Sequence, residues 1–150
     1  MSSDDPVSAD VVVIGGGMAG VSSAAFLARA GAAVHVVEAE ATLAHHSTGR
    51  SAAQYLENYG NDEVRKLTLA TTESLLPFLG PRPELMVGRE PRVDALKEAV
   101  EHAKELVPTT EFLDGDQARE ILPILRPEIA GALWEPDSKD IDVAGYHQMY

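Results

Sequence analysis

The sequence predicts an α/β fold that opens with a Rossmann-like strand–helix–strand unit and continues into a region of mixed helices and strands. The run Val11–Ile14 is β-branched and ends at glycine, which is typical of a strand buried on both faces of a parallel sheet. Residues 18–30 carry apolar and small side chains around most of a helical circumference and stop at Gly31, which predicts a helix packed against that sheet. Residues 34–38 predict a second parallel strand, joined by a right-handed crossover.

The rest of the chain predicts an α+β region. A helix capped at residues 61–63 should run to about Leu79, with Val64, Leu67, Leu75 and Leu76 on its buried side. The further elements expected are a strand at 84–87, a helix from Pro91 to about Val107, a short helix capped by Asp114 or Asp116 and stopping at Pro123, a strand at 131–134 and a helix that begins at Asp142. The predicted domains are 1–80 and 81–140, and 141–150 begins a helix.

The composition excludes several classes of function. The 150 residues include 12 basic and 24 acidic ones, and the net charge of −12 argues against nucleic acid or an anionic membrane as a partner. The absence of cysteine excludes disulfides, thiolate catalysis and cysteine-ligated metals. The N-terminus lacks the basic and apolar regions of a signal peptide, and no apolar run approaches the ~20 residues of a membrane span. A cytoplasmic protein is therefore expected.

A G-x-G-x-x-G motif, residues 15–20, joins the first strand to the first helix. Gly15 permits the tight turn, Gly17 lets a pyrophosphate approach the backbone, and Gly20 lets the helix pack close to the strand. The N-terminus of the helix adds N–H groups and the positive end of its dipole. Glu38 ends the second strand, where a carboxylate accepts hydrogen bonds from an adenosine ribose and disfavours a 2′-phosphate. The pattern predicts a dinucleotide site that does not take NADP.

The stretch His45–Tyr55, HHSTGRSAAQY, bears on the choice between NAD and FAD. Its hydroxyl groups and guanidinium can bind phosphate or ribityl oxygens, and Ser51-Ala52-Ala53 can let a flat ring lie against the backbone. These properties favour a flavin over a nicotinamide. The alternative is a simple connecting loop, because loops favour the same residues. The adjacent histidines have no third ligand at useful spacing, so no metal site is expected.

The segments VVVIGGGMAG, HVVE and HSTGRSAAQY resemble the FAD-dependent D-amino-acid oxidase and dehydrogenase superfamily, which includes glycine and sarcosine oxidases. Within it, the likeness is closest to the D-arginine dehydrogenase branch and extends through RPELMV, ELVPTTEFLDGDQAREILPIL and GALWEPDSKDIDVAGYHQMY. The resemblance covers nearly the whole chain. It implies a Rossmann-like FAD-binding βαβ unit, followed by the beginning of an α+β substrate domain, with FAD as the cofactor.

The resemblance also implies which residues contact FAD. The pyrophosphate would lie against Gly15, Gly17, Met18, Ala19 and Gly20, the adenosine ribose against Glu38 and Ala39, and the flavin against Ser47, Thr48, Arg50, Ser51, Ala52 and Ala53.

Three residues are implied at the substrate. Gln54 matches a position that the D-arginine enzyme fills with histidine, and this departure leaves the exact substrate open. Tyr59 matches a tyrosine on a mobile loop that closes over the substrate. Glu84 matches a glutamate that meets a basic side chain through a charge-assisted hydrogen bond. The alternatives are a core or rim aromatic for Tyr59 and a solvated strand-end carboxylate for Glu84.

The implied activity is oxidation of the amine of an amino acid, expected to be a D-amino acid and, in one option, a basic one. Hydride transfer to flavin N5 would give an imine that hydrolyses to a keto acid and ammonia. Family members are more than twice as long, so the chain is expected to be an N-terminal part that is inactive or weakly cofactor-binding by itself. The alternatives are a non-catalytic FAD-binding subunit that works with a partner chain, and an NAD-dependent dehydrogenase, which HSTGRSAA disfavours.

Overall fold

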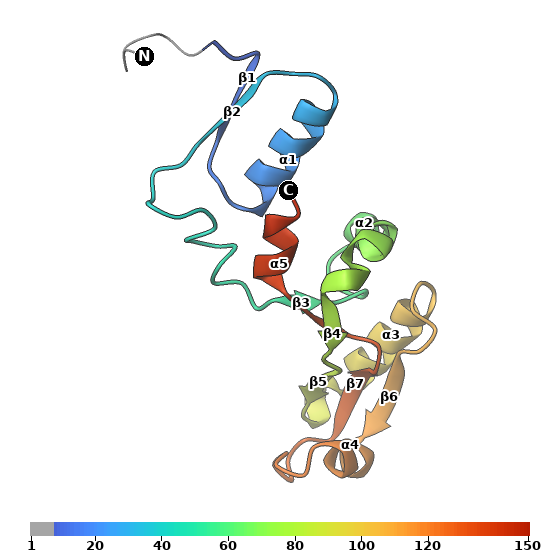
Figure 1. The fold of residues 1–150 in the computed structure, drawn as a ribbon. Coiled ribbons are helices and arrows are strands. Elements are labelled where there is room, and N and C mark those ends of the chain that lie inside the picture. The colour runs from blue at the N-terminus through green and yellow to red at the C-terminus, as the bar shows by residue number, and fades with distance from the viewer. Residues whose placement is uncertain (1–7) are drawn as a thin grey trace. The chain divides into compact units, whose positions relative to one another are not determined.

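The computed structural model describes residues 8–150, which fold into two compact units (Figure 1). The first unit contains the described residues up to Ala53 together with Asp142–Tyr150, and the second is Gln54–Ile141. The boundary that the sequence placed after residue 80 falls inside the second unit. No helix in the described part of the chain is long and apolar enough to cross a membrane.

The first unit contains the predicted strand–helix–strand. Strand β1 (Val11–Ile14) pairs in parallel with β2 (Val34–Val37), in a register from Val11↔Val34 to Ile14↔Val37. Helix α1 (Met18–Arg29) covers one face of this pair (Figure 1). The helix ends where Gly31 takes a φ of +96°, a conformation that glycine adopts without strain. The α/β fold class and its Rossmann-like opening are confirmed.

The other face of the β1–β2 pair is exposed, which differs from the expected burial on both faces. Val12 is 58% exposed and Ile14 is 88% exposed, whereas the alternate residues Val11 and Val13 are partly covered. The β-branched run is typical of a strand between two layers, but α1 supplies a layer on one side of these strands. The expectation of burial on both faces is therefore wrong for the described unit.

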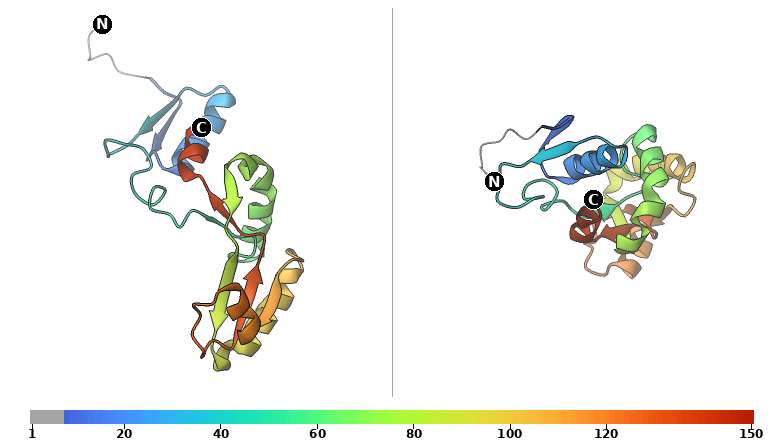
Figure 2. Two further views of the ribbon diagram at one scale, coloured as in Figure 1. Left: turned by 60° about the horizontal axis from the view of Figure 1, so that its bottom comes forward. Right: turned by 45° about the horizontal axis from the view of Figure 1, so that its top comes forward.

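Helix α5 (Val143–Gln148) completes the first unit and lies beside α1 (Figure 2). Asp142 caps it, because its carboxylate accepts a hydrogen bond of 2.9 Å from the backbone N–H of Gly145. The ring of Tyr150 contacts the rings of Phe26 and Tyr146. The predicted helix start at Asp142 is confirmed.

The second unit is built on an antiparallel sheet in the order β5 (Glu84–Gly88), β7 (Gly131–Glu135), β6 (Glu111–Asp114), as labelled in Figure 1. Helix α3 (Val93–Lys104), preceded by the 3-10 turn η2 (Glu90–Arg92), packs on one face and buries Leu96 and Val100 against Leu133. Helix α4 (Gly115–Ile121) contributes to a second cluster, in which Ala118 packs with Leu113 and Ala132. Because Ala132 and Leu133 alternate along β7, α3 and α4 cover opposite faces.

Three very short strands form a second sheet in the order β3 (Gln54–Tyr55), β8 (Lys139–Ile141), β4 (Leu79–Pro81). Both pairings are antiparallel, and Gln54 lies opposite Asp140. The sequence did not predict these strands, because two or three residues show no measurable alternation. It also did not predict β6.

Helix α2 (Asp62–Leu75) begins as predicted, with the Asn61 side chain accepting a 3.0 Å hydrogen bond from the N–H of Val64. It passes at Pro77 into the 3-10 turn η1 (Leu76–Phe78), so the helix stops short of Leu79. Its buried residues are Leu75 and Arg65, while the other predicted buried positions are exposed: Val64, Leu67 and Leu76. The predicted apolar face is therefore wrong except at Leu75.

Candidate functional site

The glycine turn of the first unit leads directly into helix α1. Gly15 has a φ of +100°, and a Cβ at Gly20 would collide with the carbonyl oxygen of Gly15, so both glycines are required by the backbone. Gly17 is the N-cap of α1 and makes no side-chain cap, and the first turn contains no acidic residue. The N–H groups and the positive dipole end are thus directed at the turn, which suits a pyrophosphate.

Glu38 closes this turn from the end of β2. Its Oε2 accepts a 2.7 Å hydrogen bond from the N–H of Gly16, and its Oε1 accepts one of 3.1 Å from the N–H of Glu40. The hydrogen bond from Gly16 is the main cause that holds the pKa of Glu38 below its usual value. The side chain is therefore an ionised acceptor beside the glycine turn, as an adenosine ribose requires.

The segment 40–53 returns to the same turn at Thr48. The N–H of Met18 donates a 3.0 Å hydrogen bond to Thr48 Oγ1, so the structure brings these two predicted residues together. The other predicted polar residues of this segment, Ser47, Arg50 and Ser51, are exposed, and Ala53 has a left-handed φ of +54°. Their contacts with FAD, and those of Ala19, Ala39 and Ala52, stay predictions.

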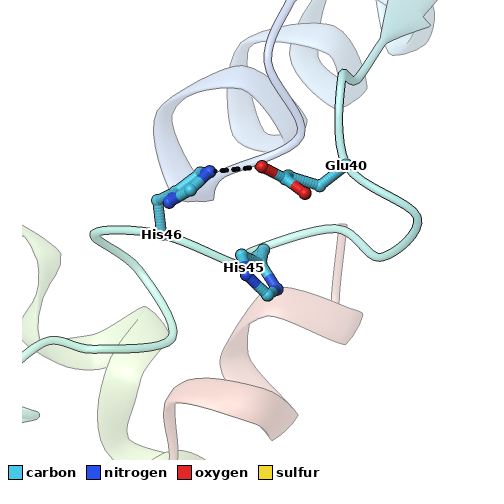
Figure 3. A group of neighbouring side chains, drawn as sticks. All are labelled: Glu40, His45 and His46. Carbon is cyan, nitrogen blue, oxygen red and sulfur yellow. Dashed lines mark hydrogen bonds and ion pairs between the residues drawn. The ribbon is translucent and has the colours of Figure 1, made fainter.

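Glu40 lies beside the two histidines of this segment (Figure 3). His46 Nε2 and Glu40 Oε1 are 2.8 Å apart, and one ligand atom of each of Glu40, His45 and His46 lies within 4.8 Å of the others. The expectation that no third ligand lies near the histidines is therefore wrong, because the turns after β2 fold Glu40 back onto them. All three side chains are exposed. The Glu40–His46 contact joins two positions of the same segment, residues 40–53.

His147 is a residue of this unit that the sequence did not single out. Its Nε2 lies 2.9 Å from the carbonyl oxygen of Gly16. Since a carbonyl oxygen only accepts, the histidine donates, and α5 thereby contacts the glycine turn. Nothing in the local pattern signals this contact, because 131 residues separate the partners.

The second unit contains a cavity of about 250 Å³ on the α3 face of its larger sheet. Glu84 and Met86 on β5, with Leu133 and Glu135 on β7, line it, as the period of two residues requires for one face of a sheet. His102 of α3 and Tyr59 also line the cavity, and Tyr59 is 70% exposed. The predicted residues Tyr59 and Glu84 thus share this cavity.

The predicted substrate residues Gln54 and Glu84 are in direct contact. Gln54 Nε2 donates a 3.0 Å hydrogen bond to Glu84 Oε2. Burial raises the pKa of Glu84 above its usual value, and the charge of Arg82 opposes this rise in part. Glu84 is partly buried, and its role at a substrate, with the alternative of a solvated strand-end carboxylate, stays a prediction.

Glu135 is a second carboxylate in the cavity that the sequence did not single out. It is 7% exposed, and burial raises its pKa, with the charges of Glu84 and Glu57 adding to the rise. The hydrogen bond that Asn58 Nδ2 donates to Glu135 Oε1 acts in the opposite direction. The one sequence feature that could have indicated Glu135 is its position, because it is a charged residue directly after the apolar strand 131–134.

The glycine turn, Glu38 and the N-terminus of α1 define a Rossmann-type dinucleotide-binding unit. The model of the family described as DAO, FAD dependent oxidoreductase, matches residues 10–150. The chain therefore belongs to the DAO family of FAD-dependent oxidoreductases, and its cofactor is FAD. The prediction of FAD is confirmed, and the NAD alternative is not supported.

Three solved structures illustrate the likeness in fold. L-amino acid deaminase from Proteus vulgaris is 19% identical with a TM-score of 0.73, over 99% of this chain and 40% of that one. L-proline dehydrogenase from P. horikoshii is 24% identical with a TM-score of 0.74, over 95% and 40%. L-alpha-glycerophosphate oxidase from Mycoplasma pneumoniae, solved with FAD bound, is 17% identical with a TM-score of 0.80, over 95% and 41%. The chain spans about two fifths of each.

Proposed function

We propose that the chain provides the FAD site and the site for the substrate side chain in an enzyme that oxidises the amine of a D-amino acid with a basic side chain. Membership of the DAO family supports the redox chemistry. The observation that carries the substrate class is Glu84, a carboxylate that lines a cavity of the second unit and accepts a hydrogen bond from Gln54. The basic side chain and the D configuration rest on the sequence resemblance.

The first unit binds and orients the cofactor in this proposal. FAD, when bound, supplies the acceptor for the hydride from the substrate Cα. The N–H groups at the start of α1 hold its pyrophosphate, and Glu38 accepts hydrogen bonds from the ribose. The proposed flavin contacts lie in the segment 47–53, where Thr48 is already held by the N–H of Met18.

The second unit selects the substrate in this proposal. Glu84 accepts a charge-assisted hydrogen bond from the cationic side chain, and Gln54 holds the Glu84 carboxylate in place. Tyr59 stands exposed beside the same cavity, where it can close over a bound substrate and exclude water. The amine must be uncharged to react, so water exclusion and positioning matter more than a strong base.

The test mixes the native, FAD-loaded protein anaerobically with single amino acids and follows the visible absorbance of the flavin. We expect D-arginine and D-lysine to bleach it faster than their neutral analogues D-citrulline and D-norleucine, and faster than the L-enantiomers. Glu84→Gln should raise KM for D-arginine by about tenfold, which corresponds to one charged hydrogen bond, and leave D-citrulline unchanged. Glu63→Gln, at the exposed start of α2, is the control.

Two results would overturn parts of this proposal separately. A protein that retains FAD but is bleached by no amino acid does not oxidise amines. Faster bleaching by L-amino acids would reject the D configuration alone. The 150-residue chain without further polypeptide is expected to bind FAD weakly and to show no amine-dependent reduction of a dye.

A further inference from the structure

A buried carboxylate, Glu135, and a partly buried one, Glu84, lie side by side in the cavity of the second unit. Glu84 on β5 and Glu135 on β7 are direct partners in the antiparallel register. Like charges at directly opposite positions of a sheet destabilise it, and burial adds a further cost. Here both residues line the same cavity, and the charge of Glu84 raises the pKa of Glu135. The arrangement suits a site that receives a positive charge.

Glu135 is held in place by a chain of hydrogen bonds that begins at the buried side chain of Arg65. Arg65 is 2% exposed, and its Nη2 lies 3.1 Å from Asn58 Oδ1 and 3.0 Å from the carbonyl oxygen of Ala103. Arginine only donates, so Asn58 must turn its oxygen to Arg65 and its Nδ2 to Glu135 and Thr110. Asn58, itself oriented by Arg65, therefore fixes the orientation of the Glu135 carboxylate, and Gln54 does the same for Glu84.

The cations near the cavity have other partners. Arg65 Nη1 lies 3.3 Å from Asp62, and the other nitrogen of its fork contacts carbonyl oxygens at the end of α3. Arg82 pairs with Asp140 at 3.0 Å, and His102 lies 3.3 Å from Asp62. Glu57 adds a negative charge near Glu135. The cavity therefore has an excess of negative charge at Glu84 and Glu135, which would attract a cationic ligand.

We propose that Glu135, held by Asn58, binds together with Glu84 the single cationic group of the substrate side chain, a guanidinium or an alkylammonium. This inference rests on the proposed function and adds a second specificity-determining residue to it. The cavity of about 250 Å³ is smaller than pockets for drug-sized ligands, and so suits one side chain. A planar guanidinium has enough donors to reach two carboxylates at once.

The test uses butylguanidinium and its uncharged counterpart butylurea as probes of the full chain. Binding is followed by calorimetry and by the ¹H–¹⁵N NMR signals of Asn58, Glu84 and Glu135. We expect butylguanidinium to bind at least tenfold more tightly than butylurea. Glu135→Gln keeps the acceptor for Asn58 and removes the charge, and it should weaken butylguanidinium binding by about tenfold while leaving butylurea unchanged. Near pH 4.5, where a carboxyl with a raised pKa still holds its proton, wild type should release protons on binding in buffers of different ionisation enthalpy, and the release should shrink in the variant.

Glu111→Gln is the matched control, because Glu111 is an exposed carboxylate on the same sheet. It should change neither affinity nor proton release. If Glu84→Gln weakens butylguanidinium binding and Glu135→Gln does not, the inference on Glu135 is wrong while the proposed substrate class stands. If wild type binds both probes equally, both the cation site and the basic substrate are rejected, and FAD-dependent amine oxidation is untouched.

Discussion

Glu84 and Glu135 couple the stability of the chain to pH in a direction opposite to that of most carboxylates. Burial raises both pKa values above the ordinary 4.5. Between pH 4.5 and the raised values, the folded state binds more protons than the unfolded state. The free energy of unfolding therefore falls as pH rises through this window, because ionisation of the buried groups is penalised. Arg82 and Asn58 oppose the shifts, and Glu57 strengthens that of Glu135.

The double variant Glu84→Gln/Glu135→Gln should lack this part of the pH dependence. We expect its free energy of unfolding, measured with urea, to increase relative to that of wild type as pH rises from 4.5 to 7. Well below pH 4.5 the difference should become constant, because there both carboxylates are protonated in the folded and in the unfolded state. Glu111→Gln should follow the wild-type curve. Parallel curves for wild type and the double variant would contradict the prediction.

At the scale of elements, Arg65 joins two helices that the sequence treats as separate. Its side chain extends from α2 to the carbonyl oxygens of His102 and Ala103 at the end of α3, which also accept backbone hydrogen bonds from the residues that follow, Glu105 to Val107. A guanidinium there adds a further donor to these acceptors and complements the negative end of the helix dipole. Arg65 thus positions α3, which forms one wall of the cavity, as well as Asn58.

Arg65→Met should destabilise the chain by about 2–4 kcal/mol, since it removes the donor to Asn58 Oδ1 and a second donor to the carbonyl oxygens at the end of α3, and it empties a buried position. The free energy of unfolding in urea measures the effect, and faster amide exchange in the last turn of α3 should accompany it. Lys66→Met removes an exposed charge from the next residue of α2 and should change stability by less than about 0.5 kcal/mol. Equal effects of the two substitutions would refute the role of Arg65.

The elements that the sequence predicts are those with enough residues to show a period. The strand at 11–14, the helices that became α1, α2 and α3, and the cap at Asp114 all follow from local patterns. The strands β3, β4 and β8 exist only because each finds a distant partner, so their residues carry no pattern. The sequence did not predict that Arg65 is buried, because the apolar period of the helix predicts leucine and valine on its buried side. Arg65 is buried instead because it contacts carbonyl oxygens at the end of α3, a contact that the period of α2 does not report.

The same limit applies to the candidate site. The glycine turn and Glu38 are predictable, since the βαβ geometry places them together within one local unit. Glu135, Asn58 and His147 act through contacts with residues 52 to 131 positions away, and no spacing rule reports these. For Gln54 and Glu84 the resemblance named each residue, and their mutual hydrogen bond came from the fold.

At the scale of the whole molecule, cofactor binding and side-chain selection are assigned to different units. If so, FAD should slow amide hydrogen exchange in the first unit, above all at residues 15–20 and 38–48. It should leave the β5–β7–β6 sheet of the second unit nearly unchanged, because none of the proposed FAD contacts lies there. Exchange measured by mass spectrometry with and without FAD tests this. Protection that appears mainly in 84–135 would contradict the assignment.

The chain leaves the first unit at Ala53 and returns to it at Asp142, so the second unit is an insertion. Its two ends meet inside the insertion itself, because β3 pairs with β8 and sets Gln54 opposite Asp140. An insertion whose ends are joined in this way can be exchanged as one cassette without stretching the host. Evolution or an engineer could therefore replace residues 54–141 to change which side chain is accepted, while the nucleotide-binding turn stays as it is.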